Sequence, residues 1–472
     1  MSLKDDAITI WKSGVAAVDA CKLVRESVMI SSTQSSEDHE LWVGEDVFPL
    51  SVSGRVIVVG FGKASGAMVV GLEKAFADHA NSLNIEGWVN VPNDPVALAS
   101  IARQREPTAL PISIVGCRPP GANLPTQEVL NGTDKIINLV RNTTDRDIVV
   151  CLISGGGSAL LEKPVDPISL NEFRDATMFL SNAGASIYEL NSVRRVISQV
   201  KGGGLSRLAN CPVVSLVISD VIGDPLDVIA SGPTNELVES DHVATSSPLE
   251  IMKKYDQTTT KIAKSVWQTV EANVASQRTP ANSRAKNFII GNIETAMLAA
   301  REKATELGYS VELTRPDGDE GDAELVGRAV AIEIARTSAD LESKPVCKIM
   351  GGETTVSLCD SPGRGGRNQH LVASATEALL DFQIDEQVDY VLLSGGTDGE
   401  DGNVSAAGAI SGRATVQSLR AHDSAAEKIR QSILDCNSHT FLSEHGMLLE
   451  VPPTFTNVCD LRVVLMENKS DT

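Results

Sequence analysis

The sequence predicts an open α/β fold divided over two or three domains. Four apolar runs rich in β-branched residues each end in a loop of small or polar residues, as strands do when they feed tight strand-to-helix turns. A chain of 472 residues is too long for one hydrophobic core. In an open α/β sheet such loops gather at the carboxyl edge, where ligands bind. The four runs lie at 55–66, 148–161, 347–356 and 390–402.

The second run carries the densest glycine loop. Ile148 to Ile153 is uniformly apolar, which indicates a strand buried on both faces, and Ala159 to Leu161 is compatible with a helix start. Because glycine has no Cβ, the N–H groups of such a loop and the following helix N-terminus can surround an anion, typically a phosphate. A tight turn without a ligand is the alternative. The loop itself is Ser154-Gly155-Gly156-Gly157-Ser158.

The other three loops favour a ligand site. One carries Lys63, and two carry acids: Glu353 in one, Asp398 and Asp401 in the other. This mixture suits a metal-bound nucleotide better than a dinucleotide.

The net charge of −21 argues against nucleic acid or an anionic membrane as the main partner, because both require a broad basic face. An anionic substrate must then be held by a few local cations. Those beside glycine runs or within motifs are therefore informative: Lys63, Arg194, Arg195, Lys201, Arg364 and Arg367.

The eight cysteines include no CxxC pair and several lie in strand-like runs, which indicates reduced core thiols in a cytoplasmic protein. A mitochondrial location is the alternative, but no transit peptide is clear, since Asp5 and Asp6 argue against an Arg-rich one. No stretch is long enough to span a bilayer.

The N-terminal third combines an amphipathic helix with a lysine-bearing loop. Apolar positions at helical spacing predict a helix over residues 4–30, and the strand at 55–59 leads through Gly60 to Gly66 into another helix. The glycine spacing fits neither a dinucleotide fingerprint nor a P-loop. Lys63 opposes the dipole of the following helix unless an anion is bound there, so a ligand role is favoured over simple solvation.

Two helices are expected around the central strand. Residues 126–141 have a helical pattern, and residues 190–205 read as a helix that ends at glycine. That second helix would place Arg194, Ser198 and Lys201 on one face. A solvated helix face is the alternative.

The strand at 213–219 leads into a loop that carries Asp220 and Asp224. Mg²⁺ needs one or two carboxylates and keeps waters and phosphate oxygens as its other ligands, so these acids are candidate metal ligands. Turn-forming aspartates are the alternative. Residues 235–285 are polar with weak periodicity and form the expected domain junction, after which a new βα unit begins at 287–290.

The C-terminal third places two arginines among glycines at a helix start. Arg364 and Arg367 precede a helical pattern at 371–380, where phosphate or carboxylate is the natural partner. The last strand is followed by Asp398 and Asp401 without calcium-loop spacing. The histidines are dispersed and form no hydrolase-like triad.

At this point the chain resembles the glycerate 2-kinase family, which has a glycerate kinase N-terminal domain and a C-terminal MOFRL domain. The matching stretches occur in the family's order over nearly the whole chain. They are GFGKAS at 60–65, SGGGSALL at 154–161, NSVRR with KGGGL at 191–205, SDVIGDPLDVIASGPT at 219–234, GGETTV at 351–356, GRGGRNQ at 363–369 and SGGTDGEDG at 394–402.

The resemblance implies two α/β domains, a Rossmann-like N-terminal domain at 1–245 and a MOFRL domain at 246–472 with the boundary within 235–285, and a site in the cleft between them. It implies transfer of the γ-phosphoryl of ATP to the 2-hydroxyl of D-glycerate. The family's essential lysine falls on Lys63 and its arginine on Arg367. The protein would act with Mg²⁺ as a monomer or homodimer.

Four departures from the family's motifs bear on metal or substrate geometry. Thr126, His370 and Asn437 stand where acids are usual, and Phe455 replaces a glycine.

Phosphoryl transfer requires mainly positioning and charge neutralisation, and this assigns the predicted roles. Lys63 and Arg367 would offset charge on one anionic centre, either the γ-phosphoryl or the glycerate carboxylate, and one of Asp220, Asp224 or Glu353 would accept the hydroxyl proton. Mg²⁺ would be held by Asp224 or Asp398. Phosphates would bind Ser154, Gly155, Gly156, Gly157, Ser158, Lys201, Gly352, Glu353 and Thr354, and glycerate would bind Arg194, Arg364 and Asn368.

Two rival functions are kept open. An NAD(P)H-dependent hydroxypyruvate reductase would use the same three-carbon acid, and a non-catalytic relative would bind ligand without turnover. ATP binding without NADH binding excludes the first, and ADP production excludes the second.

Overall fold

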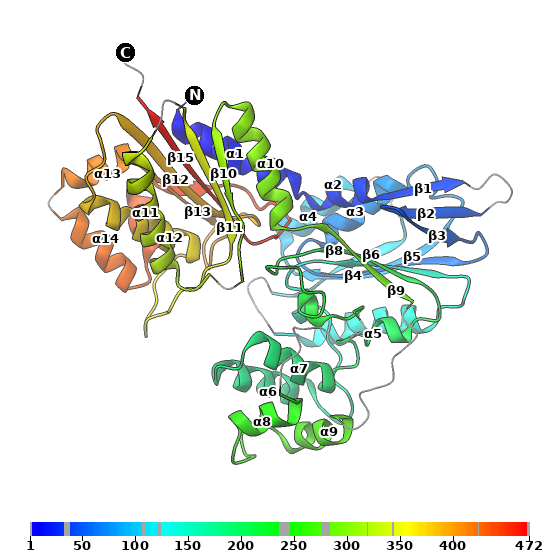
Figure 1. Ribbon diagram of the computed structural model, residues 1–472. Helices are drawn as coiled ribbons and strands as arrows, with labels where there is room; N and C mark the ends of the chain where they lie inside the picture. Colours follow the sequence, from blue (N-terminus) through cyan, green and yellow to red (C-terminus); the bar gives the residue numbers. More distant parts are fainter. Residues whose placement is uncertain are drawn as a thin grey trace. The chain divides into compact units, whose positions relative to one another are not determined.

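The protein folds as two compact α/β units (Figure 1). The computed structural model describes residues 2–32, 38–105, 110–119, 124–235, 246–274, 284–318, 320–341, 344–422 and 424–469. The Rossmann-like unit comprises Ala20–Ile290, and the C-terminal unit comprises Met1–Asp19 with Gly291–Thr472. The mixed α/β class with two sheet-containing domains is thereby confirmed. Within the described residues no helix is long and apolar enough to cross a membrane.

The two units divide the chain differently from the expected boundary at 245/246. The Rossmann-like unit extends to Ile290, beyond the 235–285 interval, and the first helix belongs to the C-terminal unit. The physical reason is packing. Residues 248–274 form two helices on the helical cluster of the Rossmann-like unit, and Trp11 of the first helix donates from Nε1 to the carbonyl of Gly395 at 3.3 Å.

A six-stranded sheet forms the centre of the Rossmann-like unit. Its strand order is β6-β5-β4-β7-β8-β9, and the pairs from β6 through β8 are parallel. Numbered from β4, this is the order 3-2-1-4-5-6 of the doubly wound fold, which confirms the Rossmann-like prediction. The strands are β4 (Arg55–Phe61), β5 (Asn84–Pro92), β6 (Ile112–Arg118), β7 (Ile148–Ile153), β8 (Val213–Ile218) and β9 (Ala285–Gly291).

The βα unit expected to begin at 287–290 is present as β9 followed by a helix. β9 itself pairs with β8 at the edge of this first sheet, so the unit begins in the Rossmann-like part of the chain. Only the following helix, α10 (Ile293–Glu306), belongs to the C-terminal unit.

Helices cover the sheet because the central strands are apolar on both faces. All six residues of β7 are buried, as are all six of β8. α5 (Gln127–Arg141) covers one face through Val129, Ile136 and Val140. The other sheet-associated elements are α2 (Ala20–Ser27), α3 (Ser65–Phe76), α4 (Pro95–Gln104) and the antiparallel strands β1 (Val28–Ser32), β2 (His39–Val43) and β3 (Asp46–Leu50).

The single helix expected over 4–30 is wrong in extent. The segment forms α1 (Leu3–Ala17) and α2, with Val18 and Asp19 between them, and then enters β1 at Val28. The apolar spacing is continuous, but the two helices pack in different units.

A separate helical cluster completes the Rossmann-like unit. Ser169, Ser186 and Ser247 each begin a helix with a capping box that satisfies N-terminal N–H groups. The segment 246–274 therefore contains two helices joined by a turn, where its weak periodicity indicated a junction. The helices are α6 (Leu170–Asn182), α7 (Ile187–Ile197), α8 (Pro248–Tyr255) and α9 (Lys264–Val274).

The C-terminal unit has its own six-stranded sheet, ordered β10-β11-β15-β12-β13-β14. β10 and β11 are parallel, whereas β15 runs antiparallel to both of its neighbours, β11 and β12. The carboxyl ends of β11 and β12 therefore meet the amino end of β15. The strands are β10 (Ser310–Thr314), β11 (Val346–Gly352), β12 (Val388–Gly396), β13 (Ala406–Gly412), β14 (Leu448–Glu450) and β15 (Asp460–Asn468).

Side-chain alternation assigns the two faces of this sheet. Leu392, Val464 and Met466 pack into the core beneath α12, while a Cβ added at Gly351 or Gly14 would clash with side chains between α1, α10 and β15. Figure 1 shows the two helix layers on opposite faces of the sheet. One layer holds α1 and α10, and the other holds α11 (Ala323–Ala339), α12 (Arg367–Asp381), α13 (Arg413–Arg420), α14 (Ala425–Leu434) and α15 (Ser438–Glu444).

Candidate active site

Two motif loops of the Rossmann-like unit meet where its strand order reverses. β4 and β7 are parallel neighbours, so their carboxyl ends define the switch point at which open α/β sheets bind ligands. The backbone N–H of Lys63 donates to the carbonyl of Gly155 at 2.8 Å, and the N–H of Ala64 donates to Ser154 Oγ at 3.0 Å. The structure therefore places the GFGKAS and SGGGS loops side by side, as their positions after strands predicted.

Glycine is required where these loops approach each other. Gly62 has φ +141°, and a Cβ there would lie 2.2 Å from Ser154 Oγ. Gly156 has φ +73°, in the left-handed region.

The helix start expected after the SGGGS loop is wrong. Gly157–Ala159 forms one 3₁₀ turn, and the next α-helix begins at Leu170. The loop therefore lacks the dipole of a following α-helix. Any anion bound here depends on backbone N–H groups and on neighbouring cations.

Two cations flank Gly156. A Cβ added at this glycine would lie 3.6 Å from Lys63 Cγ and 3.6 Å from Arg118 Nη2. The Lys63 side chain is exposed, whereas Arg118 is only 2% exposed.

Lys201 lies beneath the glycine loop and is 1% exposed. Its Nζ donates to the carbonyl of Ser158 at 2.9 Å and to Ser158 Oγ at 3.1 Å. Burial lowers the pKa of Lys201 to about 8, although the carboxylate of Glu162 at 3.5 Å opposes this. Its predicted phosphate-binding role stays a prediction, while its contacts hold the carboxyl end of the loop.

The expected helix at 190–205 is also shorter than predicted. α7 ends at Ile197 and Ser198 is extended, so Arg194, Ser198 and Lys201 do not share a helix face. They are related through Glu162 instead. This fully buried carboxylate accepts from Ser198 Oγ at 2.6 Å, and burial raises its pKa against the opposing charge of Lys201. Burial lowers the pKa of Arg194, which Glu162 partly offsets.

The third motif of this unit follows β8, the neighbour of β7. Ser231 Oγ lies 2.9 Å from Ser158 Oγ and donates to Asn191 Oδ1 at 2.9 Å, which links the SDVIGDPLDVIASGPT, SGGGS and NSVRR motifs. Ser231 adopts φ +63°, a strained value for a residue with a Cβ. The predicted base Asp220 and metal ligand Asp224 are both half-buried in this loop, with Asp224 at φ +53°.

In the C-terminal unit, Arg367 begins α12 and is held by two carboxylates. It donates to both oxygens of Asp460, from Nε at 2.6 Å and from Nη2 at 3.1 Å, and from Nη1 to Glu353 Oε1 at 2.5 Å. Burial by itself would lower the pKa of Arg367, but the negative charges of Asp460 and Glu353 outweigh this and raise it. Asp460 is completely buried, so the pair is a fork of the strong bidentate kind.

Asp401 caps the same helix. Its carboxylate accepts from the backbone N–H groups of Asn368 at 3.0 Å and Gln369 at 2.8 Å. Burial raises the pKa of Asp401 to about 6 in spite of these bonds. Asn368 is buried and accepts from Ser394 Oγ at 2.6 Å, so this predicted substrate ligand has partners within the unit.

Asp398 is the predicted metal ligand of this unit. A Cβ added at Gly396 would lie 3.1 Å from Asp398 Oδ1 and 3.5 Å from Asp460 Oδ1, so both carboxylates crowd the end of β12. Across the described residues there is no group of three or more His, Cys, Asp or Glu side chains placed to hold a metal. A cation held by one or two carboxylates, as Mg²⁺ often is, does not require such a group.

The remaining predicted residues of this unit differ in exposure. Thr354 is buried and its Oγ1 has no hydrogen-bond partner in the described part of the chain, while Arg364 is exposed. Gly352 has φ +156°, and a Cβ there would lie 2.0 Å from Glu320 Oε2. Their ligand roles stay predictions.

One family departure falls on a strained backbone position. Phe455, where the family has glycine, adopts φ +58°. Left-handed conformations cost a residue with a Cβ about 1–2 kcal/mol.

We therefore expect the Phe455→Gly variant to be about 1 kcal/mol more stable than Phe455→Ala. Both variants lose the ring, but only glycine also relieves the strain. Urea unfolding of the two variants measures the difference. Equal midpoints would show that the backbone at 455 is not strained.

A second departure, His370, predicts a pH dependence of stability. Burial lowers the pKa of His370, although Asp322 and Glu324 oppose this. Below about pH 6.5 the unfolded chain then binds a proton more readily than the folded chain, so the free energy of unfolding falls as pH falls. His370→Gln should flatten this decline between about pH 6.5 and 5, measured by thermal unfolding. His422→Gln, at an exposed histidine, is the control and should leave the decline unchanged.

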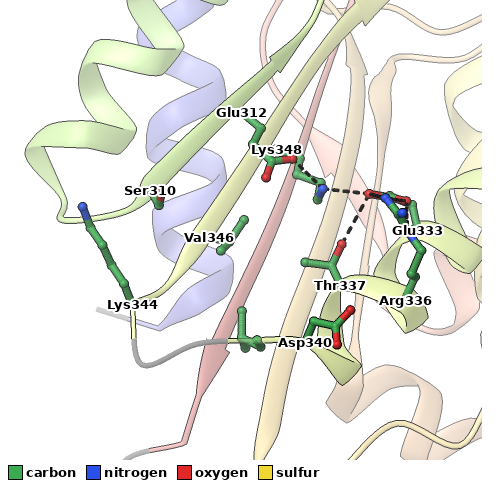
Figure 2. A pocket seen from close by; sticks show the side chains of 10 residues that line it. Ser310, Glu312, Glu333, Arg336, Thr337, Asp340, Lys344, Val346 and Lys348 are labelled. Carbon is green, nitrogen blue, oxygen red and sulfur yellow. Dashed lines mark hydrogen bonds and ion pairs between the residues drawn. The ribbon is translucent and has the colours of Figure 1, made fainter.

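A hollow of about 440 Å³ lies elsewhere in the C-terminal unit. It is lined at the amino ends of β10 and β11 by Ser310, Glu312 and Lys348 and on α11 by Glu333. Figure 2 shows Lys348 between these two glutamates, and its Nζ pairs with both, at 2.6 Å and 2.8 Å. The hollow lies at the opposite ends of these strands from the GGETTV loop, and two of its three cations, Lys348 and Arg336, already pair with glutamates, so it is not the candidate site.

Sequence reasoning missed the buried partners of the predicted residues. Glu162 and Asp460 lie in no glycine loop. Each pairs with a cation that is distant in sequence, Lys201 and Arg367 respectively. Arg118 had a detectable signal, because it is a cation at the end of a strand in a strongly acidic chain.

Known proteins with similar sequences support the family resemblance described above. Residues 6–271 match a family described as a domain of unknown function, DUF4147, and residues 346–460 match the MOFRL family. A glycerate kinase from Danio rerio is 32% identical, with 98% of each chain covered. A D-glycerate 2-kinase from Thermotoga maritima is 37% identical, covering 73% of this chain and 79% of its own.

Solved structures agree over the full length. The crystal structure of a glycerate kinase from Thermotoga maritima has a TM-score of 0.76 at 32% identity and covers 98% of this chain and 99% of its own. That of a protein from Pyrococcus horikoshii OT3 has a TM-score of 0.73 at 28% identity, covering 100% and 99%. With its ordered motifs and full-length relatives, this chain belongs to the glycerate 2-kinase family.

Proposed function

We propose that this protein is an ATP-dependent glycerate 2-kinase that phosphorylates the 2-hydroxyl of D-glycerate. The observation that carries the proposal is the junction of the Lys63 loop and the glycine loop at the switch point of a Rossmann-like sheet. It occurs in a chain whose full-length relatives include glycerate 2-kinases.

In the proposed reaction, the glycine loop orients the phosphates of ATP. The N–H groups of Gly155 and Gly156 donate to phosphate oxygens, and Lys63 offsets charge on the transferred phosphoryl group. The N–H of Gly157 donates to the carbonyl of Ser154 at 3.2 Å, and Ser158 Oγ donates to Ser231 Oγ at 2.9 Å, so these two groups hold the shape of the loop. Lys201 fixes the loop from below through the carbonyl of Ser158. These groups act by positioning and charge neutralisation, which is what a loose phosphoryl-transfer transition state requires.

Arg367 has a modified role in this proposal. Its two carboxylate partners give the Arg367, Asp460 and Glu353 cluster a net charge of about −1, so it attracts a bare anion less than a single arginine would. Arg367 then acts mainly by orienting these carboxylates, with part of its fork directed at substrate. Glu353 and Asp220 remain candidates for accepting the hydroxyl proton.

The acids fit Mg²⁺, which favours oxygen ligands and retains water and phosphate oxygens. The Mg²⁺ ion would be held either by Asp398, which lies beside Asp460, or by Asp224. When bound, the ion neutralises charge on the β- and γ-phosphates.

The product distinguishes the acceptor hydroxyl. Incubation with D-glycerate, Mg-ATP and enolase, without phosphoglycerate mutase, should yield phosphoenolpyruvate. A requirement for the mutase would identify the 3-hydroxyl as acceptor. Because the strand order is shared with dinucleotide-binding folds, NADH binding is measured in parallel, and the proposal requires ATP binding without it.

We also propose a cytoplasmic location and a monomeric or homodimeric state. Each of the eight cysteines, all within the described ranges, is a thiol, which suits a reducing compartment. Light scattering of the purified protein measures the oligomeric state.

A further inference from the structure

Arg118 is a buried cation, and two of its three guanidinium nitrogens lack hydrogen-bond partners among the described residues. The residue ends β6 and is 2% exposed. Its Nε and Nη1 are buried and have no hydrogen-bond partner among the described residues. Burial lowers the pKa of Arg118, and no neighbouring carboxylate offsets that effect.

The two other arginines buried in the described chain are paired. Arg462 donates to both oxygens of Glu320 at 2.8 Å and 2.6 Å, and Arg413 donates to the carbonyls of Ile384 and Asp385. A buried charge without acceptors is costly and is retained where function uses it. Arg118 therefore needs an explanation that packing does not provide.

The position of Arg118 supplies one. Its Nη2 approaches Gly156, where a Cβ would lie 3.6 Å from it and 3.6 Å from Lys63 Cγ. The guanidinium thus borders the glycine loop at the carboxyl edge of the sheet, together with the exposed lysine of the neighbouring loop. Two cations and a left-handed glycine at one loop form a built site for an anion.

We propose that Arg118, with the backbone of the Gly155 to Gly157 loop, forms an oxyanion-binding site that receives a phosphate or carboxylate group of a substrate. The inference rests on the proposed function for the identity of that substrate. The planar guanidinium donates to two oxygens of one group, which satisfies the donors that the protein leaves without acceptors.

Ligand binding to the Arg118→Leu variant tests this site. Mg-ATP and D-glycerate are titrated separately into wild type and variant by calorimetry. We expect the affinity for one of them to fall by about 10- to 100-fold, the scale of a lost charged hydrogen bond. A loss for Mg-ATP identifies a phosphate as the anion, and a loss for D-glycerate identifies the carboxylate. Unchanged affinity for both overturns the inference.

Stability separates this role from a structural one. Removing an unpaired buried charge should leave the melting temperature of the unliganded protein unchanged or higher. Arg118→Lys keeps the charge and the aliphatic stem, so it provides a folded variant if the leucine variant fails to fold. It lacks the planar fork and should also bind the affected ligand more weakly. Wild-type affinity in Arg118→Lys for both ligands overturns the inference.

Arg105, at the C-terminal end of α4, provides a control arginine that contacts the same strand. It pairs with Glu73 and donates to the carbonyl of Ile112, at the amino end of β6, whereas Arg118 lies at the carboxyl end. Arg105→Leu should lower the melting temperature and leave both affinities unchanged. Wild-type turnover is assayed separately. Absence of glycerate phosphorylation would refute the proposed function, while the binding titrations would still decide the role of Arg118.

Discussion

Lys63→Ala should lower kcat by roughly 10²- to 10³-fold, the scale seen when one preorganised transition-state donor is removed. The chain carries a net charge of −21, so fixed cations must offset the charge of a transferred phosphoryl group. The backbone of Lys63 is anchored to Gly155 at 2.8 Å, which holds the start of its side chain beside the glycine loop. A steady-state ADP-release assay with D-glycerate and Mg-ATP measures the effect.

Folding should be unaffected because the Lys63 side chain is exposed. Lys74→Ala, at an exposed lysine in the last turn of the following helix, is the matched control and should retain normal turnover. Near-normal turnover in Lys63→Ala with an unchanged melting temperature would remove Lys63 from the reacting centre.

Arg367→Ala should lower kcat by a similar roughly 10²- to 10³-fold, because the variant loses both the orientation of Asp460 and Glu353 and the part of the fork directed at substrate, and it should also destabilise the protein. The buried carboxylate of Asp460 would lose its bidentate partner, and stranding a buried charge in this way costs on the order of 3 kcal/mol. Arg367→Lys should rescue little turnover, because an ammonium cannot reproduce the fork. Turnover and urea unfolding are measured on each variant.

The double variant Arg367→Ala/Asp460→Asn separates the two effects. It removes the stranded charge and should recover most of the stability without recovering turnover. Recovery of both would mean that Arg367 serves only the fold.

The sequence also predicts that Lys63 and Arg367 act on one anionic centre, and a double-mutant cycle tests this. Two cations that stabilise the same developing charge should give a combined loss smaller than the product of the single losses. If the loss in kcat of the double variant equals the product of the two single losses, Lys63 and Arg367 act on separate substrate groups.

The glycine loops and the strands before them were predictable because their signals are local. Six consecutive apolar residues at Ile148–Ile153 require burial on both faces, and a run of three glycines permits a close loop. The end of α7 was not predictable from periodicity. The apolar spacing continues past Ile197, but the chain turns there to bring Ser198 and Lys201 to Glu162.

The sequence by itself determined the α/β class and the loops that carry Lys63, the glycine run and Arg367, since these follow from patterns within about ten residues. Tertiary structure alone decided which charges are satisfied. Asp460 reaches Arg367 across 93 residues because β15 runs antiparallel and places its amino end beside the carboxyl ends of β11 and β12. Arg118 borders Gly156 because both residues lie at the carboxyl ends of parallel strands of one sheet, and packing there gives Arg118 no carboxylate partner among the described residues.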